Sequence, residues 1–310
     1  MTDRARKTPR RAANDLTVLL RTVLGEDRFP VDVEALALEV SRNHEDPITA
    51  VKGVDIDGFE GMLRARRKKP GWQILYNTQP RYRGRERFTL AHEFGHYLLH
   101  RSPLTADHYR DGELSDDFDF ECLPLQANDW KDVEKEREEE ADTFASFLLM
   151  PIDDYRNQIG GQEMTRDLLG HVTDRYGVSL LAATRKWIEF TDTRAAMVVA
   201  RDGFALWGRA TTSAYKSGVF IRSGMPIPDG SVTAMGPASQ YASSQQPASL
   251  PSGIWTFSRG SEPVRELAFF SDRLGMSVSL LQFDARDGGA DIEEEEPWDS
   301  YDQFIAGVRE

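Results

Sequence analysis

The 310-residue sequence contains a single cysteine, Cys122, which excludes a disulfide framework within one chain. A chain without such bonds is typical of a reducing compartment, so we expect a cytoplasmic protein. No apolar run approaches the ~20 residues needed to span a bilayer. The basic start predicts no secretion signal, because the stretch 16–24 that follows it contains Arg21 and lacks a small-residue cleavage site.

Basic residues are too few for a protein that binds nucleic acid or anionic membranes broadly. There are 38 Lys and Arg residues against 51 Asp and Glu residues, which gives a net charge of −13. This balance argues against direct DNA binding, although it allows a local basic patch. Hydrophobic residues make up 40% of the chain, a normal share for a globular protein with a buried core.

The pattern along the chain predicts an α+β protein with two folded domains and charged ends. We expect a basic, disordered tail at 1–12 and a solvated acidic tail at 284–310. The first domain is predicted over 13–158 and is followed by a helical, helix-turn-helix-like segment at 159–192. A β-rich C-terminal domain, with a sensory or partner-binding role, is predicted over 193–283.

Hydrophobic periodicity and turn residues locate the individual elements. Helical segments are predicted from Asp15 onward, before Pro30, and at 31–41, 83–100, 132–150, 165–176 and 179–190, with Pro30 opening the second of them. Strands are predicted at 50–54, 61–65, 72–76, 197–200, 204–207, 218–221, 254–257 and 277–281. Loops are expected at 102–131, which could border a substrate cleft, and at 236–253, which is rich in Pro, Ser, Gln and Ala.

The run His92-Glu93-Phe94-Gly95-His96 is the strongest chemical signal in the sequence. On an α-helix, residues four apart lie about 40° apart on one face, so His92 and His96 can bind one Zn²⁺ together. Glu93 is then placed to act as the general base for a water molecule activated by the metal. The run lies on a proline-free amphipathic helix, as this motif requires. We therefore predict a hydrolase with one Zn²⁺ per chain.

A catalytic zinc usually has three protein ligands, so a further ligand is expected outside this run. His100 continues the four-residue spacing, but it lies about 12 Å from His92 along a straight helix and cannot join the same tetrahedron. We expect His100 at the helix end or on the surface. The longer metzincin motif also fails, because Leu99 and Ser102 stand where it needs glycine and histidine.

The remaining candidates are carboxylates on the helix predicted at 132–150. On a helical wheel, Glu138 and Asp142 share the apolar stripe with Ala141 and Ala145, which would allow close packing on the histidine helix. A carboxylate there is costly unless it is paired or binds metal, so Glu138 is the predicted third ligand. Asp142 is predicted to accept the free ring N–H of a liganding histidine. The other glutamates are expected to be solvated: Glu134, Glu136, Glu139 and Glu140.

These segments resemble the ImmA/IrrE family of metallo-endopeptidases over about residues 30–190. The resemblance is carried by the sequence RFTLAHEFGHYLLH from Arg87, by EEEADTFA from Glu138 and by LLMP from Leu148. The length of the 102–131 segment departs from the family pattern, which leaves the shape of the substrate cleft open. Some relatives carry a GAF-like sensor after the protease, but residues 193–283 do not establish one.

The resemblance implies a zincin-like domain with a gluzincin-type site. His92, His96 and Glu138 would be its ligands and Glu93 its catalytic acid/base. It also implies a substrate class, since members cleave helix-turn-helix repressors and so release genes of mobile elements or of DNA-damage responses. The fold class is therefore expected to be a zincin-like α+β domain with a helical extension, followed by a β-rich α+β domain.

Two alternatives remain open at this point. The segment 168–186 has helix-turn-helix rhythm with Arg185 and Lys186 on its second helix, which would suit a DNA-binding or scaffolding regulator. The metal site could also be intact but without proteolytic activity. An oxyanion stabiliser is expected near the zinc, and the sequence does not rank its candidates. Those candidates are Tyr76, Tyr97, His100 and Arg87.

Overall fold

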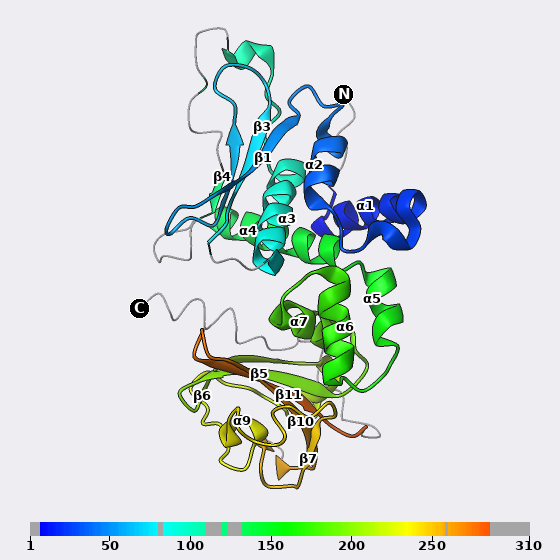
Figure 1. The fold of residues 1–310 in the computed structure, drawn as a ribbon, viewed down its shortest axis with the longest axis vertical. Helices are drawn as coiled ribbons and strands as arrows, with labels where there is room; N and C mark the ends of the chain where they lie inside the picture. Colours follow the sequence, from blue (N-terminus) through cyan, green and yellow to red (C-terminus); the bar gives the residue numbers. More distant parts are fainter. Residues whose placement is uncertain are drawn as a thin grey trace. The chain divides into compact units, whose positions relative to one another are not determined.

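The structure is a computed structural model that describes residues 7–79, 83–109, 114, 120–122, 132–257 and 260–285 (Figure 1). Within these ranges it contains helices together with one mixed and two antiparallel sheets, which confirms the predicted α+β class. The chain divides into two compact units. Unit 1 comprises Met1–Tyr155 and Asp174–Ser179, and unit 2 comprises Arg156–Thr173 and Leu180–Glu310. No helix in the described ranges is long and apolar enough to cross a membrane.

Unit 1 combines a four-stranded sheet with a helical layer. Its strands are β1 (Ile48–Val54), β2 (Gly61–Ala65), β3 (Trp72–Asn77) and β4 (Phe120–Cys122), in the order β1-β3-β2-β4. Its helices are α1 (Pro9–Leu24), α2 (Val33–Ser41), α3 (Arg83–Leu99) and α4 (Asp132–Leu149), with short 3₁₀ turns at Gly25–Arg28 and Ala106–Tyr109. Strands β1 and β3 are parallel, and the other neighbours are antiparallel.

Helix α3 lies between the sheet and α4, and this position explains its sequence. Along β2, Gly61, Leu63 and Ala65 are buried while Arg64 is exposed, so alternate side chains face the interior. All residues from Ala91 to Tyr97 are buried, because α3 packs on β2 and β3 as well as on α4. The metal motif therefore lies on a rigid element in the middle of unit 1.

Small residues allow α3 and α4 to approach closely. A Cβ added at Gly95 would lie 3.0 Å from Phe144 Cδ1 and 3.3 Å from Ala141 Cα. Phe144 also packs edge-to-face on Phe94, with ring centroids 5.8 Å apart. The expected close packing at Ala141 is confirmed, and Gly95 is the matching small residue on the facing helix.

The N-terminal region differs from the sequence-based expectation. Helix α1 begins at Pro9, inside the segment predicted to be a disordered tail, because the Thr8 side chain accepts a hydrogen bond from the Arg11 amide and caps the helix. Pro30 was expected to open the next helix, but α2 begins at Val33. Asp32 caps it through a 3.0 Å hydrogen bond from the Ala35 amide.

The segment Asp174–Ser179 belongs to unit 1 although it lies within unit 2 in sequence. Tyr176 is fully buried, donates to Asp154 Oδ2 at 2.6 Å and packs edge-to-face on Phe29. Arg175 forms a bidentate pair with the same carboxylate, at 2.7 and 2.8 Å. The chain thus leaves unit 1, returns to it and leaves again, and the division runs through the helical segment predicted at 159–192.

Unit 2 is built on a five-stranded antiparallel sheet in the order β6-β5-β11-β10-β7. These strands are β5 (Ala195–Arg201), β6 (Phe204–Ala210), β7 (Ala248–Leu250), β10 (Val264–Ser271) and β11 (Met276–Gln282), beside a small ribbon of β8 (Thr256–Phe257) and β9 (Gly260–Ser261). The helices are α5 (Ile152–Ile159), which starts in unit 1, α6 (Arg166–Tyr176), which ends there, α7 (Leu180–Phe190), α8 (Thr212–Lys216) and α9 (Val232–Met235).

Both faces of this sheet are covered, with α7 on one side and α9 on the other (Figure 1). Strand β5 shows the consequence, since all of its residues except Arg201 are buried. Ala196, Val198 and Ala200 belong to the apolar cluster on the α8 and α9 side. Continuous hydrophobic strands of this kind are typical of a sheet buried on both faces.

Several elements of unit 2 were not predicted correctly. Residues 218–221 form no strand; Val219 and Ile221 are buried and join the apolar cluster from an irregular segment, and Phe220 is partly buried against it. Only the end of the strand predicted at 254–257 forms, as β8. Strand β10, strand β7 and helix α5 were not predicted. The acidic tail from residue 286 and most of the 102–131 segment lie outside the described residues, apart from 102–109, 114 and β4.

Candidate metal centre

Helices α3 and α4 bring three potential metal ligands together. His92 and His96 project from α3, and their Nε2 atoms are 3.0 Å apart. Glu138 projects from α4, with Oε2 3.1 Å from His92 Nε2 and Oε1 3.2 Å from His96 Nε2. Among the described residues, these three form the group of His, Cys, Asp and Glu side chains that could hold a metal ion.

The protonation of these groups suits a metal. His92 Nδ1 lies 2.8 Å from Asp142 Oδ1, so a neutral ring carries its proton on Nδ1 and presents a lone pair at Nε2. Burial lowers the pKa of His96 and favours its neutral form. Burial alone would raise the pKa of Glu138, but hydrogen bonds that the two imidazoles donate in the absence of a metal hold that pKa well below its ordinary value, and a metal ion would take the place of those ring protons. A neutral imidazole and an ionised carboxylate are the forms that ligate metals.

The spacing also fits a tetrahedral ion. Zinc–ligand bonds of about 2.0–2.1 Å at tetrahedral angles place neighbouring ligand atoms about 3.3 Å apart. The three measured separations lie between 3.0 and 3.2 Å. Three acceptor atoms that converge in this way repel one another unless a cation lies between them. The donor set therefore fits a divalent metal with one coordination position left for water or substrate.

Glu93 directly follows His92 on α3, and its carboxylate packs against a glycine on the sheet. The residue is completely buried. A Cβ added at Gly61 on β2 would lie 2.5 Å from Glu93 Oε1 and 2.6 Å from Thr89 Cγ2, so only glycine leaves room for this carboxylate. Sequence analysis missed Gly61, because no local pattern indicates which strand residue faces the helix at that point.

Asp142 contacts a histidine ring as predicted, but not for the predicted reason. Its side chain is 59% exposed, so it does not lie in a buried apolar stripe. Glu138 is also partly exposed, at 34%. The helical wheel identified the face of α4 that contacts α3, but it predicted too much burial for Glu138 and Asp142, because α4 packs on α3 near the surface of unit 1. The two carboxylates are therefore the solvent-exposed side of a cluster whose two histidines are buried.

His100 and Glu140 differ in burial from what was expected. His100 lies at the end of α3, directly after Leu99, which is one of the two predicted places, but its side chain is 0% exposed and so is not on the surface. Its Nδ1 lies 2.9 Å from His96 Nδ1, and its Nε2 lies 2.8 Å from Glu140 Oε2. Glu140 was expected to be solvated, but this contact directs it toward α3. The repeated four-residue spacing His92–His96–His100 was the signal that could have indicated the contact.

Two of the possible oxyanion stabilisers donate hydrogen bonds to backbone carbonyl groups. Tyr97 is fully buried and donates to the Asp46 carbonyl at 3.2 Å, and burial raises its pKa to about 12. Arg87 donates to the Val31 carbonyl at 2.8 Å. These contacts assign structural roles to both side chains.

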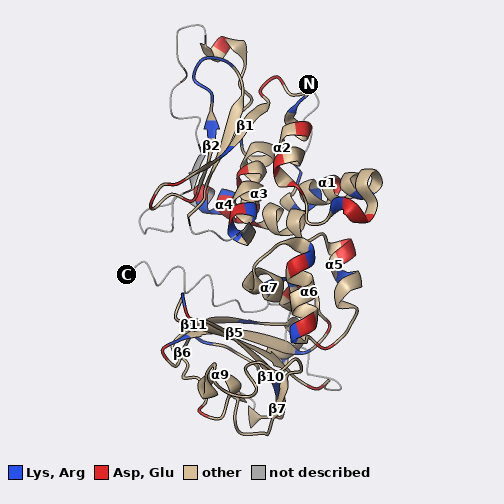
Figure 2. Cartoon of the chain, in the orientation of Figure 1, with Lys and Arg blue, Asp and Glu red and all other residues tan. Residues whose placement is uncertain are grey.

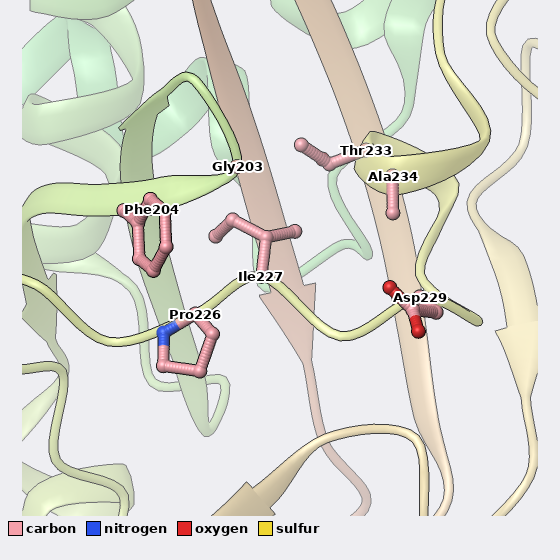
Figure 3. A pocket seen from close by; sticks show the side chains of 7 residues that line it. All are labelled: Gly203, Phe204, Pro226, Ile227, Asp229, Thr233 and Ala234. Atoms are coloured by element: carbon pink, nitrogen blue, oxygen red, sulfur yellow. The ribbon is translucent and has the colours of Figure 1, made fainter.

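Unit 2 contains a separate cavity of about 440 Å³ (Figure 3). The three candidate ligands all belong to unit 1. Figure 3 shows Phe204 and Pro226 at one end and the carboxylate of Asp229 at the other. The full lining is Gly203, Phe204, Pro226, Ile227, Asp229, Thr233 and Ala234.

Comparison with known proteins gives one family match. Residues 55–187 match the model Peptidase_M78, described as the IrrE N-terminal-like domain. No curated protein matches the sequence. Among solved structures, the chain is similar to a Mycobacterium tuberculosis transcriptional regulator at 14% identity and a TM-score of 0.44, over 88% of this chain and 76% of that chain. The family match includes the three potential ligands together with Glu93 and Asp142.

Proposed function

The chain belongs to the ImmA/IrrE family through residues 55–187, and from this premise we propose that it is a zinc-dependent endopeptidase. Its substrate is a regulatory protein, and a helix-turn-helix transcriptional repressor is the class that the family resemblance indicates. The observation that carries the proposal is the convergence of His92, His96 and Glu138 on one site, with the buried Glu93 next to His92 on the same helix.

The three ligands would hold the metal at their Nε2 and carboxylate oxygen atoms. When bound, zinc supplies Lewis acidity, which makes a water molecule acidic near neutral pH and polarises the scissile carbonyl. Asp142 orients His92 by accepting its Nδ1–H. Because Glu138 is partly exposed, a peptide can approach the cluster from the side of α4.

Glu93 is the proposed general base. Its carboxylate accepts a proton from the water that attacks the carbonyl carbon, and it then delivers that proton to the nitrogen of the leaving amine. Burial in a dry environment strengthens such a proton transfer, and contact with Gly61 limits where the carboxylate can lie. Positioned proton transfer of this kind contributes about 10²–10⁴-fold to a rate.

The alternative of a DNA-binding regulator receives no support from α6 and α7. Lys186 is 1% exposed, and Arg185 lies over the Trp207 ring at 5.5 Å, so these cations of α7 pack against the protein. Figure 2 shows acidic and basic segments side by side on α6, which carries Arg166 and Asp167 near its start. A recognition helix needs exposed side chains that reach bases and phosphates.

The proposal is tested by metal analysis and a cleavage assay on the full-length protein, with a helix-turn-helix repressor from the same genome as substrate. The wild type is expected to contain about one Zn²⁺ per chain and to cleave the repressor. Glu93→Gln should keep the metal and lose cleavage, whereas Glu139→Gln, an exposed carboxylate on α4, should keep both. Cleavage by Glu93→Gln at the wild-type rate would exclude the proposed base.

A further inference from the structure

We propose that His100 and Glu140 are positioning residues that fix the ring proton of His96 and thereby strengthen metal binding. This inference rests on the proposed function. The contacts form a chain from Glu140 Oε2 to His100 Nε2 at 2.8 Å, and from His100 Nδ1 to His96 Nδ1 at 2.9 Å. Neither residue takes part in the reaction steps described above.

With both rings neutral and Glu140 ionised, the contacts between Glu140, His100 and His96 allow one proton arrangement. A carboxylate at Nε2 requires a proton there, so the neutral ring of His100 leaves Nδ1 free to accept. His96 must then donate from its own Nδ1, which leaves Nε2 as a lone pair directed at the ligand cluster. The reverse arrangement would place a proton on His96 Nε2 and block metal ligation. Glu140 therefore selects the tautomer of both rings.

Burial makes the contacts between Glu140, His100 and His96 more important for metal binding than the matching contact between Asp142 and His92. The His100 side chain is 0% exposed, and its ring centroid lies 4.9 Å from that of His96. Solvent cannot replace His100 as the acceptor for His96. In contrast, Asp142 is 59% exposed, so water can take its place beside His92. The loss of His100 should consequently weaken metal binding more than the loss of Asp142.

The test is the Zn²⁺ affinity of the full-length protein, measured by competition with a chromophoric chelator, together with the visible absorption bands of the Co²⁺-substituted protein. His100→Phe keeps an aromatic ring and removes the acceptor, so it is expected to weaken Zn²⁺ binding about 10–100-fold and to change the Co²⁺ bands. His100→Asn should recover part of this loss, because its side-chain oxygen can accept near the position of Nδ1. Asp142→Asn should lose less affinity than His100→Phe.

Glu140 provides a second variant that leaves the buried ring in place. Its side chain is 23% exposed, so Glu140→Ala should fold, and we expect a loss of Zn²⁺ affinity in the same direction. Glu139→Gln is the matched control because Glu139 is an exposed neighbour on α4 that pairs with Lys135. It should bind Zn²⁺ as the wild type does. Circular dichroism checks the fold of every variant, and Glu140→Ala decides the test if His100→Phe does not fold.

The outcomes separate this inference from the proposed function. Wild-type Zn²⁺ affinity and Co²⁺ bands in folded His100→Phe, or in Glu140→Ala, would overturn the positioning role alone. A wild-type protein that binds no Zn²⁺ would refute the proposed function and the inference with it. Ring ¹⁵N spectra of the Zn²⁺-loaded protein give an independent check. They should show the His100 proton on Nε2, and a proton on Nδ1 would contradict the inference.

Discussion

Replacing Gly61 by alanine tests whether catalysis depends on the position of the Glu93 carboxylate. The new Cβ would lie 2.5 Å from Glu93 Oε1, whereas ordinary contacts begin near 3.4 Å, so the two atoms must separate by about 0.9 Å. Strand β2 cannot easily move away, because Gly61 is paired with Tyr76 on one side and with Cys122 on the other. The carboxylate itself is therefore expected to shift.

A misplacement of about 1 Å can reduce a rate by about 10²-fold, which corresponds to about 2.7 kcal/mol of transition-state stabilisation. We expect kcat/KM for repressor cleavage to fall by about this factor in Gly61→Ala. Zn²⁺ affinity should remain unchanged, because the added methyl group approaches Glu93 and Thr89 rather than the ligands. Crowding should also lower the free energy of unfolding by about 1–3 kcal/mol.

The assay combines steady-state cleavage, Zn²⁺ titration and urea unfolding. Gly170→Ala is the control, because a Cβ there meets nothing within 4 Å and the residue lies in helix α6. It should retain activity and gain up to about 1 kcal/mol of stability. If Gly61→Ala cleaved its substrate at the wild-type rate, the argument that this glycine positions the base would be refuted.

Three further predictions concern the surroundings of the site. Asp142→Ala should weaken Zn²⁺ binding about tenfold through the loss of the contact with His92, and an unchanged dissociation constant would contradict that role. Gly95→Ala should lower the free energy of urea unfolding by about 1–3 kcal/mol, since the methyl group would press on α4; equal stability would show that the helices separate freely. Burial would raise the pKa of Asp154, but hydrogen bonds hold it below its ordinary value, so its stabilising effect is present above about pH 4 and is lost as the pH falls through the lower folded pKa. Asp154→Asn should therefore flatten the acid side of the stability profile measured by urea unfolding, and a profile identical to that of the wild type would exclude this effect.

The elements around the site were predictable because their sequence patterns match local geometry. Strands β1, β2 and β3 and helices α3 and α4 lie within a few residues of their predicted ranges, whereas β4 falls inside the predicted 102–131 loop. The spacing of His92 and His96 requires only helical periodicity. Glu138 was located by the wheel and the family resemblance, and the structure brings it within 3.2 Å of both rings.

The features that were missed depend on contacts between distant segments. The wheel describes one helix at a time, so it could not show that α3 faces Glu140 at the level of His100. Similarly, Pro30 has the composition of a helix start, but the cap at Asp32 sets the first turn of α2. Strand β10 was missed because its charged residues Arg265 and Glu266 interrupt the apolar pattern. Glu266 is nevertheless buried and accepts hydrogen bonds from the amides of Val232 and Thr233.

The return of residues Asp174–Ser179 to unit 1 makes the two units topologically interdependent. A fragment that ends at residue 158 would contain the ligands and Glu93, yet it would lose the hydroxyl that donates to Asp154 and the aromatic partner of Phe29. It would also lose the backbone of Val178 and Ser179, which lies about 3.0 Å from a Cβ built at Gly84, at the start of the histidine helix. Unit 1 is therefore not an excisable module, and cleavage of the chain after residue 158 would separate it from part of its own framework.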